Sequence, residues 1–317
     1  MARWSTLLLD DASLAEMPRI PVADVFRHAD LVTAQRPQPQ ALYERWEKQQ
    51  WSAQAIELGQ DREDYERRLP KAARKALEES IATFIIGEYT GLDLLGPILT
   101  GAPEERDHLY LGTQIADETR HTQLMLRLGE EVLGLDPDPR RMLTQAWNMV
   151  TSPHRDLSRL ETEVIRELQE HPSDYRRWLR AVALFHLITE GVLALVGQRA
   201  IVRSLHGVPM LSGVKAGFTA MARDESRHVS FGLHALRQGV NEGYGDDIRE
   251  VIEQGAPIAL RIEEGGEAER TDQGPTMRDL GIDSLRKQLR LIGIEDAFAD
   301  HVIGLSFPSP QSPENPS

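Results

Sequence analysis

Apolar residues recur every three or four positions along most of this chain, and the recurrence predicts helices separated by breaks at Gly, Pro and Asn. Four long segments carry the broadest apolar stripes: residues 71–100, 104–134, 173–205 and 211–239. Each is followed by residues that end helices, such as Gly-Ala-Pro or Asp-Pro-Asp-Pro. No alternation typical of strands stands out. The sequence therefore predicts an all-α fold with four long helices at its centre.

Three regions are expected from the spacing of these helices. Residues 1–39 contain several prolines and little periodicity, which predicts an extended arm with room for one short helix. A helical domain is expected over residues 40–304, and the Pro- and Ser-rich residues 305–317 are expected to be a disordered tail. Shorter helices are expected at residues 140–150, 156–169, 246–264, 277–291 and 295–303, with a polar loop at 266–275.

The start of the helical domain is expected to be one helix, at residues 40–59, with Leu42, Trp46 and Trp51 as its apolar positions. A charged connector at residues 62–68 is expected to join it to the first long helix. On this interpretation the two indoles are packing residues.

The four long segments fall into two halves, and the first helix of each half carries a lone acid. Glu88 lies in an apolar run with no other residue charged at neutral pH. Glu190 lies in a second apolar run, in which His186 is the only other ionisable residue. Burying a carboxylate without a partner costs several kcal/mol or forces its protonation. A compensating group is therefore expected inside the fold.

The second helix of each half supplies a Glu and a His three residues apart, in the pentapeptides Asp-Glu-Thr-Arg-His (117–121) and Asp-Glu-Ser-Arg-His (224–228). Helix residues i and i+3 share a face about 4.5 Å apart along the axis, so both can reach one metal ion. One such pair is more often a solvated face, but the order Glu, Glu-x-x-His, Glu, Glu-x-x-His is that of ferritin-like dinuclear carboxylate proteins. The predicted metal ligands are Glu88, Glu118, His121, Glu190, Glu225 and His228.

The ligand set also indicates the metals. Four carboxylates balance two divalent cations, and oxygen with imidazole nitrogen suits iron or manganese. The chain contains no Cys, which excludes thiolate sites and disulfides. The expected cofactor is two metal ions, Fe/Fe or Mn/Fe.

Three further polar residues are candidates for supporting roles. Asp117 and Asp224 each lie four residues before a ligand His, where they could accept a hydrogen bond from an imidazole N–H. Ordinary surface acids are the alternative for both. His186 is either a core histidine or an outer partner of the ligands, and a core position is favoured.

Charge and hydropathy limit the partners. The net charge of −14 argues against nucleic-acid binding, which needs a basic surface. The N-terminus lacks the basic region and long apolar core of a signal peptide. No stretch is expected to span a membrane, because none approaches about 18 uncharged apolar residues. A cytoplasmic protein is therefore expected.

Five stretches resemble the ligand-binding oxidases that are related to the small subunit of ribonucleotide reductase. The resemblance covers about residues 42–265 and includes the order of the ligands. It implies a ferritin-like, usually homodimeric protein with a manganese–iron or di-iron cofactor that activates O₂ and binds a long-chain fatty acid at the metals. The stretches are residues 84–88, 117–123, 189–195, 224–228 and 257–261.

The chain departs from this family at its tyrosines. The family's ether crosslink joins a Tyr and a Val at the positions of Phe185 and Gly91, so no crosslink is expected and the cavity is reshaped. The radical Tyr of reductase subunits is replaced by Met125, and residues 307–317 contain no Tyr. A ribonucleotide reductase subunit is therefore disfavoured.

The expected function is an O₂-dependent oxidoreductase, an oxidase or monooxygenase, that acts on an organic and hydrophobic substrate with an external reductant and works as a homodimer. A small organic or fatty-acid-like ligand is expected in an apolar cavity, although apolar residues there are also what a helical core needs. The alternatives are non-catalytic metal binding or iron handling, and a radical-generating subunit. The residues expected to line the cavity are Phe84, Phe185, Ile188 and Gly91.

Overall fold

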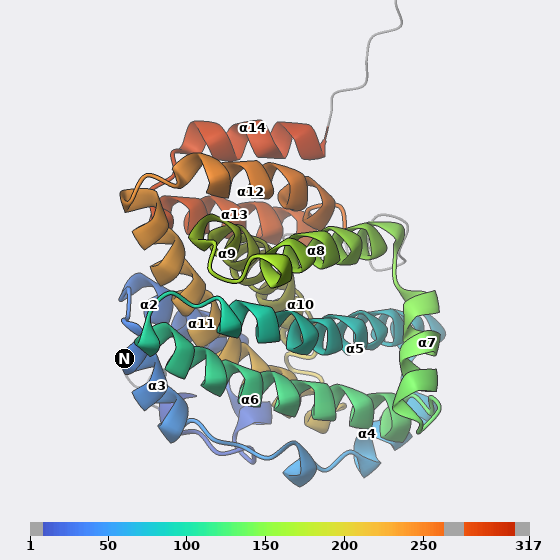
Figure 1. Cartoon of the computed structure of the whole chain (residues 1–317). Helices are drawn as coiled ribbons and strands as arrows, with labels where there is room; N and C mark the ends of the chain where they lie inside the picture. The colour runs from blue at the N-terminus through green and yellow to red at the C-terminus, as the bar shows by residue number, and fades with distance from the viewer. Residues whose placement is uncertain (1–8, 263–275, 308–317) are drawn as a thin grey trace, which may run out of the picture.

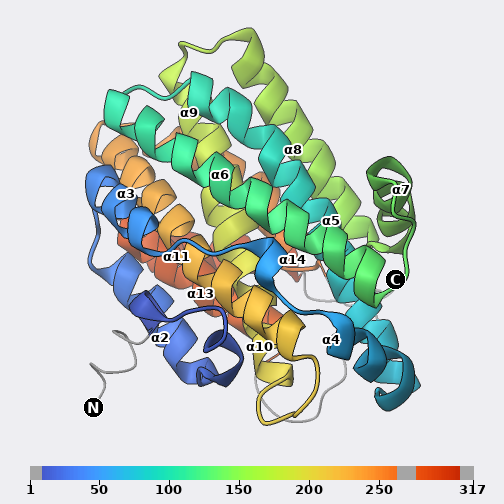
Figure 2. The ribbon, with the colours of Figure 1, turned by 90° about the horizontal axis from the view of Figure 1, so that it is seen from below.

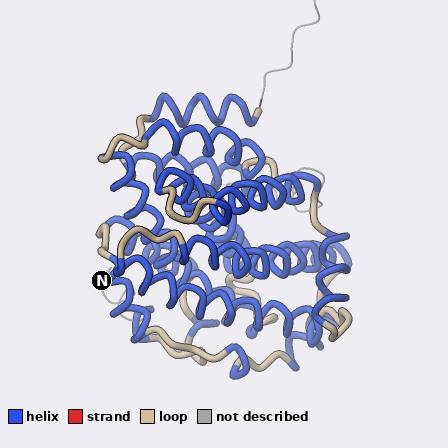
Figure 3. Tube along the Cα trace, in the orientation of Figure 1, coloured by secondary structure: helices blue, strands red, loops and turns tan. Residues whose placement is uncertain are grey.

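The computed structural model describes residues 9–262 and 276–307, and throughout these ranges it contains helices and loops but no strand (Figure 1, Figure 3). The all-α prediction is therefore confirmed. The expected polar loop at residues 266–275 and residues 308–317 of the expected tail lie outside the described residues.

Four long helical segments form the centre of the fold, as predicted. They are α5 (Lys71–Thr100), α6 (Glu105–Arg127), the continuous run of α9 (Tyr175–Val182), η5 (Ala183–Ala194) and α10 (Leu195–Ser204), and α11 (Ser212–Asn241). α5 packs along α6, and α11 packs along η5 and α10. This arrangement is a four-helix core with additional helices around it.

The third segment changes its hydrogen-bonding pattern at its centre. η5 is a π-helix, in which each N–H bonds the carbonyl five residues earlier. The hydroxyl of Thr189 also lies 3.2 Å from the carbonyl oxygen of Leu184, five residues before it. π-Helical turns occur often at functional sites, and this one carries Glu190.

The segment Tyr175–Ser204 is long and apolar enough to cross a membrane, contrary to the expectation that no stretch would be. In the fold, however, 72% of its most apolar window is buried inside the protein. Leu179, Ala183 and Leu187 belong to the main hydrophobic core. A core helix surrounded by other helices is apolar on all sides for the same reason as a membrane span, namely exclusion from water.

α11 is buried along most of its length, although its sequence mixes polar and apolar residues. Arg223, Asp224, Arg227 and His228 are each at most 2% exposed. Charged side chains in such positions need partners, because an unpaired buried charge is costly. The centre of the molecule therefore contains a polar network inside an apolar shell.

Shorter helices cover this core, within a few residues of the positions predicted. They are α7 (Pro139–Met149), α8 (Ser152–Glu170), α12 (Gly245–Ala259), α13 (Met277–Ile292) and α14 (Asp296–Ser306). α12, α13 and α14 are grouped at one end of the molecule, and α8 packs against both α12 and α5 (Figure 1). α12 and α13 also pack on η5.

The N-terminal region contributes helices to the bundle surface. α2 (Val22–Ala34) packs on α11, and α3 (Pro39–Lys48) packs on α6 and α11 (Figure 2). The helix expected at residues 40–59 is wrong beyond Lys48, where α3 ends. Gln49 leaves the helical conformation there, and its carbonyl accepts a hydrogen bond from Arg223 (3.1 Å).

The connector expected at residues 62–68 is helical instead, in α4 (Gly59–Glu63) and the π-helical turn η3 (Asp64–Arg68). Its acids have a structural role. Asp61 accepts hydrogen bonds from the backbone N–H groups of Gly213 (3.1 Å) and Val214 (2.7 Å), and Asp64 accepts from that of Leu211 (2.9 Å). These acids satisfy N–H groups at the start of α11, which would otherwise lack partners.

Candidate metal centre

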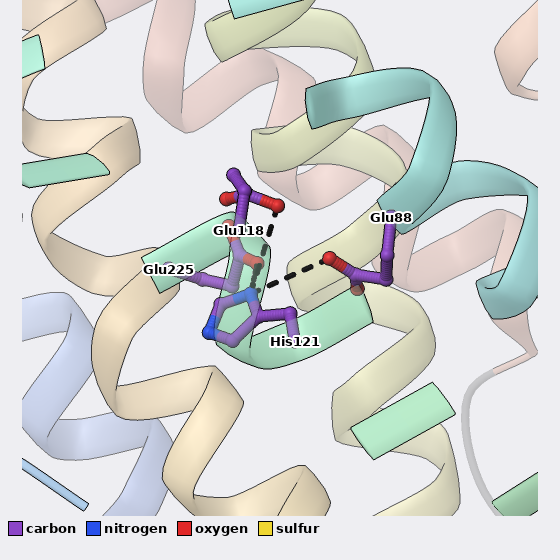
Figure 4. Close-up of side chains that lie close together, drawn as sticks. All are labelled: Glu88, Glu118, His121 and Glu225. Carbon is purple, nitrogen blue, oxygen red and sulfur yellow. Dashed lines mark ion pairs between the residues drawn. The ribbon is translucent and has the colours of Figure 1, made fainter. Parts of the chain in front are cut away.

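The six predicted ligands converge at the centre of the four-helix core. Glu88 comes from α5, Glu118 and His121 from α6, Glu190 from η5, and Glu225 and His228 from α11. Figure 4 shows four of them, with three carboxylates facing one imidazole. All six are at most 5% exposed.

The ligand atoms form two groups that share two carboxylates. In the first group, His121 Nδ1 lies 3.4 Å from Glu88 Oε2, 3.7 Å from Glu118 Oε2 and 3.4 Å from Glu225 Oε1 (Figure 4). Within each group the ligand atoms all lie within 4.8 Å of one another. Glu118 and Glu225 belong to both groups.

The second group repeats the arrangement around the other imidazole. His228 Nδ1 lies 3.1 Å from Glu118 Oε1, 3.3 Å from Glu225 Oε2 and 3.6 Å from Glu190 Oε1. Glu118 and Glu225 thus each direct one oxygen to each imidazole. Carboxylates placed in this way could each contact both of two neighbouring ions.

Several of these atoms are buried without a hydrogen-bond partner. They include Nδ1 of both imidazoles and one oxygen each of Glu118, Glu190 and Glu225. Leaving such atoms unpaired is costly, and each carboxylate oxygen is a ligand that iron and manganese accept. The residues present therefore fit a pair of metal ions.

The opposite nitrogen of each imidazole faces an acid, but the pairing is crossed between helices. His121 Nε2 on α6 lies 3.3 Å from Asp224 Oδ2 on α11, and His228 Nε2 lies 3.2 Å from Asp117 Oδ2 on α6. When each imidazole donates its Nε2–H to the facing acid, its Nδ1 lone pair is directed at the carboxylate cluster. Both acids, expected as acceptors, lie where that role requires.

Arg227 joins the two acids. Its Nη2 lies 2.7 Å from Asp117 Oδ2 and 2.8 Å from Asp224 Oδ1, and its side chain is fully buried. Burial opposes ionisation of Asp224, but Arg227, His121 and Arg223 together outweigh it and hold the pKa of Asp224 well below its usual range. The sequence alone assigns no role to this arginine, because nothing local distinguishes it from an exposed one.

The two tryptophans predicted as packing residues are hydrogen-bond donors to the same acids. Trp46 Nε1 donates to Asp117 Oδ1 (3.0 Å), and Trp51 Nε1 donates to Asp224 Oδ2 (2.7 Å). The Trp51 ring also stacks on the His121 imidazole, with centroids 6.2 Å apart. Both indoles therefore help to fix the orientation of the acids and, through them, of the imidazoles.

His186 is a core residue that also reaches the cluster through an amide. Its Nε2 lies 3.1 Å from Gln114 Oε1, and Gln114 Nε2 donates to Glu190 Oε1 (2.8 Å). Burial, with the nearby His228, lowers the pKa of His186 to about 3, so it is neutral at pH 7. It is an outer partner as well as a core histidine, although the core position alone was favoured.

A cavity of about 180 Å³ opens beside the cluster. Phe84, Phe185 and Gly91 line it, as expected, and a Cβ on Gly91 would lie 3.4 Å from the Phe185 ring. Ile188, also expected there, is not among the lining residues and packs instead near Gly255 of α12. In the π-helix it faces the outer helices, while Thr189 and Glu190 face the cavity.

Solved structures of an R2-like ligand-binding oxidase have a similar fold. A tyrosine-to-phenylalanine mutant with an aerobically reconstituted Mn/Fe cofactor matches with a TM-score of 0.63 and 19% identity, over 85% of this chain and 91% of that chain. A glycine-to-phenylalanine mutant with an anaerobically reconstituted Mn/Fe cofactor matches with a TM-score of 0.68 and 19% identity, over 82% and 94%. At this identity the likeness establishes a shared fold.

The comparison with protein families identifies the family of the chain as well as its fold. The model of the ribonucleotide reductase small chain matches residues 29–265, a span that contains all six clustered residues and both outer acids. The match extends over more than half of the sequence, and the chain therefore belongs to the ribonucleotide reductase small chain family.

Proposed function

We propose that this chain is a dinuclear metal oxidase or oxygenase that uses O₂ on a small organic substrate. Glu88, Glu118, His121 and Glu225 would hold one ion. The second would be held by Glu118, Glu190, Glu225 and His228. The observation that carries the proposal is the pair of carboxylates, Glu118 and Glu225, shared by two buried groups.

When bound, an Fe/Fe or Mn/Fe pair supplies the redox chemistry for O₂. The protein holds the imidazoles in one orientation through Asp117 and Asp224, whose charges Arg227 partly offsets. Gln114 fixes one oxygen of Glu190 by hydrogen bonding.

The cavity supplies the second part of the proposal. Glu88, Glu118, Glu190 and Glu225 all line it, so a molecule bound there lies next to the ligand carboxylates. Phe84 and Phe185 present apolar rings on its wall, which limits water near the cluster. A cavity that reaches the ligands supports an enzyme that acts on a bound molecule.

The test is to reconstitute the full chain with Fe²⁺ and with Fe²⁺ plus Mn²⁺, then measure metal content and O₂ uptake with a reductant. About two metal ions per chain and reductant-dependent O₂ uptake are expected. Protein that retains neither iron nor manganese would refute the site. Uptake of many iron ions per chain without an organic product would instead support iron storage.

Two further expectations stay predictions. The homodimer follows from the family resemblance and is measured by sedimentation of the reconstituted protein. The external reductant is identified by the electron donor that sustains repeated O₂ uptake.

A further inference from the structure

One face of α8 forms a polar wall of the cavity. His154, Ser158 and Glu161 line it, together with Leu157, at spacings that place them on one side of the helix. Thr151, at the start of α8, also lines the cavity, next to Ile262. The wall thus extends about 15 Å along the axis from Thr151 to Glu161, at 1.5 Å per residue.

Glu161 is the acid on this wall that lies outside the candidate metal ligands and is deeply buried. Its side chain is 4% exposed, and its Oε1 contacts the hydroxyl of Thr189, the residue directly before Glu190. No Lys, Arg or His forms an ion pair with it among the described residues. Burial raises the pKa of Glu161 to about 7, and the contact with Thr189 opposes the rise.

Thr189 can serve Glu161 in either protonation state. Its hydroxyl lies near both Glu161 Oε1 and the carbonyl oxygen of Leu184. A protonated Glu161 can donate to the hydroxyl, which then donates to Leu184. An ionised Glu161 can accept from the same hydroxyl. The site therefore accommodates a carboxylate without rearranging its neighbours.

The described lining of the cavity offers no cationic side chain to an anion. Besides Glu161, the ionisable residues that line it are the four candidate ligand glutamates, whose charges two divalent ions would balance, together with Glu79 and His154. No Lys or Arg is among the described residues that line it. Burial and the charge of Arg155 lower the pKa of His154 to about 4, so its imidazole is neutral at pH 7.

The size of the cavity limits the rest of the ligand. Its volume of about 180 Å³ is close to the roughly 150 Å³ of an engineered apolar cavity that binds benzene. The apolar part of its lining includes Phe84, Phe185, Leu193 and Met277. A monocyclic or short aliphatic body fits this space, whereas a long-chain fatty acid exceeds it.

We infer that Glu161 recognises a protonated amine, and that the ligand of this cavity is a small amphipathic amine with its nitrogen at Glu161 and its apolar body against the phenylalanine wall. Glu161 and the four ligand carboxylates line the same cavity, so a ligand held at Glu161 shares that space with the metal centre. The inference rests on the proposed function for any reaction of the bound amine. Binding of the amine is a separate property that can be measured without a reaction.

The experiment uses full-length protein loaded with metal and kept anaerobic, and it measures binding of benzylamine, benzyl alcohol and benzoate by calorimetry. Benzylamine is expected to bind at least about tenfold more tightly than benzyl alcohol, since a charge-assisted hydrogen bond is stronger than a neutral one. Glu161→Gln is expected to remove that preference and leave benzyl alcohol binding within about twofold. Glu163→Gln, an exposed acid on the same helix, is the matched control and is expected to change neither.

A second measurement needs no variant. At pH 6 the acid is largely protonated, so binding of the ammonium is expected to release a proton, which calorimetry in buffers of different ionisation enthalpy detects. Benzyl alcohol is expected to release none. Tightest binding of benzoate, or an amine affinity unchanged in Glu161→Gln, would overturn the inference.

The two proposals fail in different ways. Amine selectivity in protein that takes up no iron or manganese would refute the metal oxidase and leave the amine site standing. Two bound metals and O₂ uptake without amine selectivity would refute the amine site alone.

Discussion

The metal centre and the α8 wall of the cavity both bury acids, but they stabilise them in different ways. In the centre, Glu118 lies beside two imidazoles, and the acids behind those imidazoles contact Arg227. On the wall, Glu161 has one hydroxyl as its partner. The comparison separates acids whose partners are built into the fold from an acid that leaves room for a partner from outside.

This difference changes what each acid can do. The carboxylates of the centre face fixed groups and are held for a cofactor of defined geometry. Glu161 borders open space, so its charge state depends on what enters the cavity. Four predictions test the comparison.

The largest effect is expected from Glu118→Ala, which removes a carboxylate common to both groups of ligands. Loss of both metals is expected, measured as metal per chain after reconstitution and desalting. Glu105→Gln, at an exposed acid on the same helix, is expected to keep normal metal content. Two metals retained in Glu118→Ala would mean that this carboxylate is not shared.

The second effect concerns Glu161→Gln and the pH dependence of stability. An acid whose pKa rises from 4.5 to about 7 on folding destabilises the fold by roughly 3 kcal/mol once the pH exceeds 7, and by almost nothing below pH 4.5. The variant is therefore expected to unfold at higher denaturant concentration than wild type at pH 8, and this difference in stability is expected to fall below about 1 kcal/mol at pH 5. An equal difference in stability between variant and wild type at both pH values would show that the charge of Glu161 is stabilised by groups within the fold.

A third effect tests the crossed pairing of acids and imidazoles. Asp117→Asn is expected to weaken metal binding at the His228 group, and Asp224→Asn at the His121 group, by about 10- to 100-fold each. Anomalous diffraction at the iron and manganese edges, on crystals of each variant, locates the ion that is lost. Loss of the ion beside the imidazole on the same helix as the substituted acid would contradict the pairing.

The smallest effect is expected at the boundary between the two regions. A Cβ on Gly91 would lie 3.4 Å from Phe185 and 3.7 Å from Glu118 Oε2, which is ordinary van der Waals contact. Gly91→Ala is therefore expected to raise the free energy of unfolding by about 0.5–1 kcal/mol through helix propensity. Gly87→Ala, on the same helix with no neighbour within 4 Å of the added Cβ, is the control. A loss of stability in Gly91→Ala but not in Gly87→Ala would show that this edge of the cavity cannot accommodate an added methyl group.

Much of the centre could be predicted because its signals are local. Glu88 and Glu190 stand out as acids within apolar runs, and each Glu-x-x-His pair shares a helix face at a fixed spacing. The helices themselves follow from the recurrence of apolar residues. These features depend on residues within a few turns of one another, so the sequence alone contains them.

The surroundings of the centre could not be predicted in this way. Trp46 and Trp51 have the composition of packing residues, and their role depends on acids that are 71 and 173 residues away. The crossed pairing of Asp117 with His228 depends on how α6 and α11 are rotated toward each other. Glu161 looks like any acid on an amphipathic helix until the fold brings Thr189 of η5 beside it.

The sequence by itself determined the four long helices and the six candidate ligands, because helical periodicity brings residues three and four apart onto one face. Only the tertiary structure decided which acid supports which imidazole, where the helix widens into η5, and which buried acid faces the cavity. Those outcomes depend on the relative rotation and packing of helices distant in sequence, which no local pattern specifies.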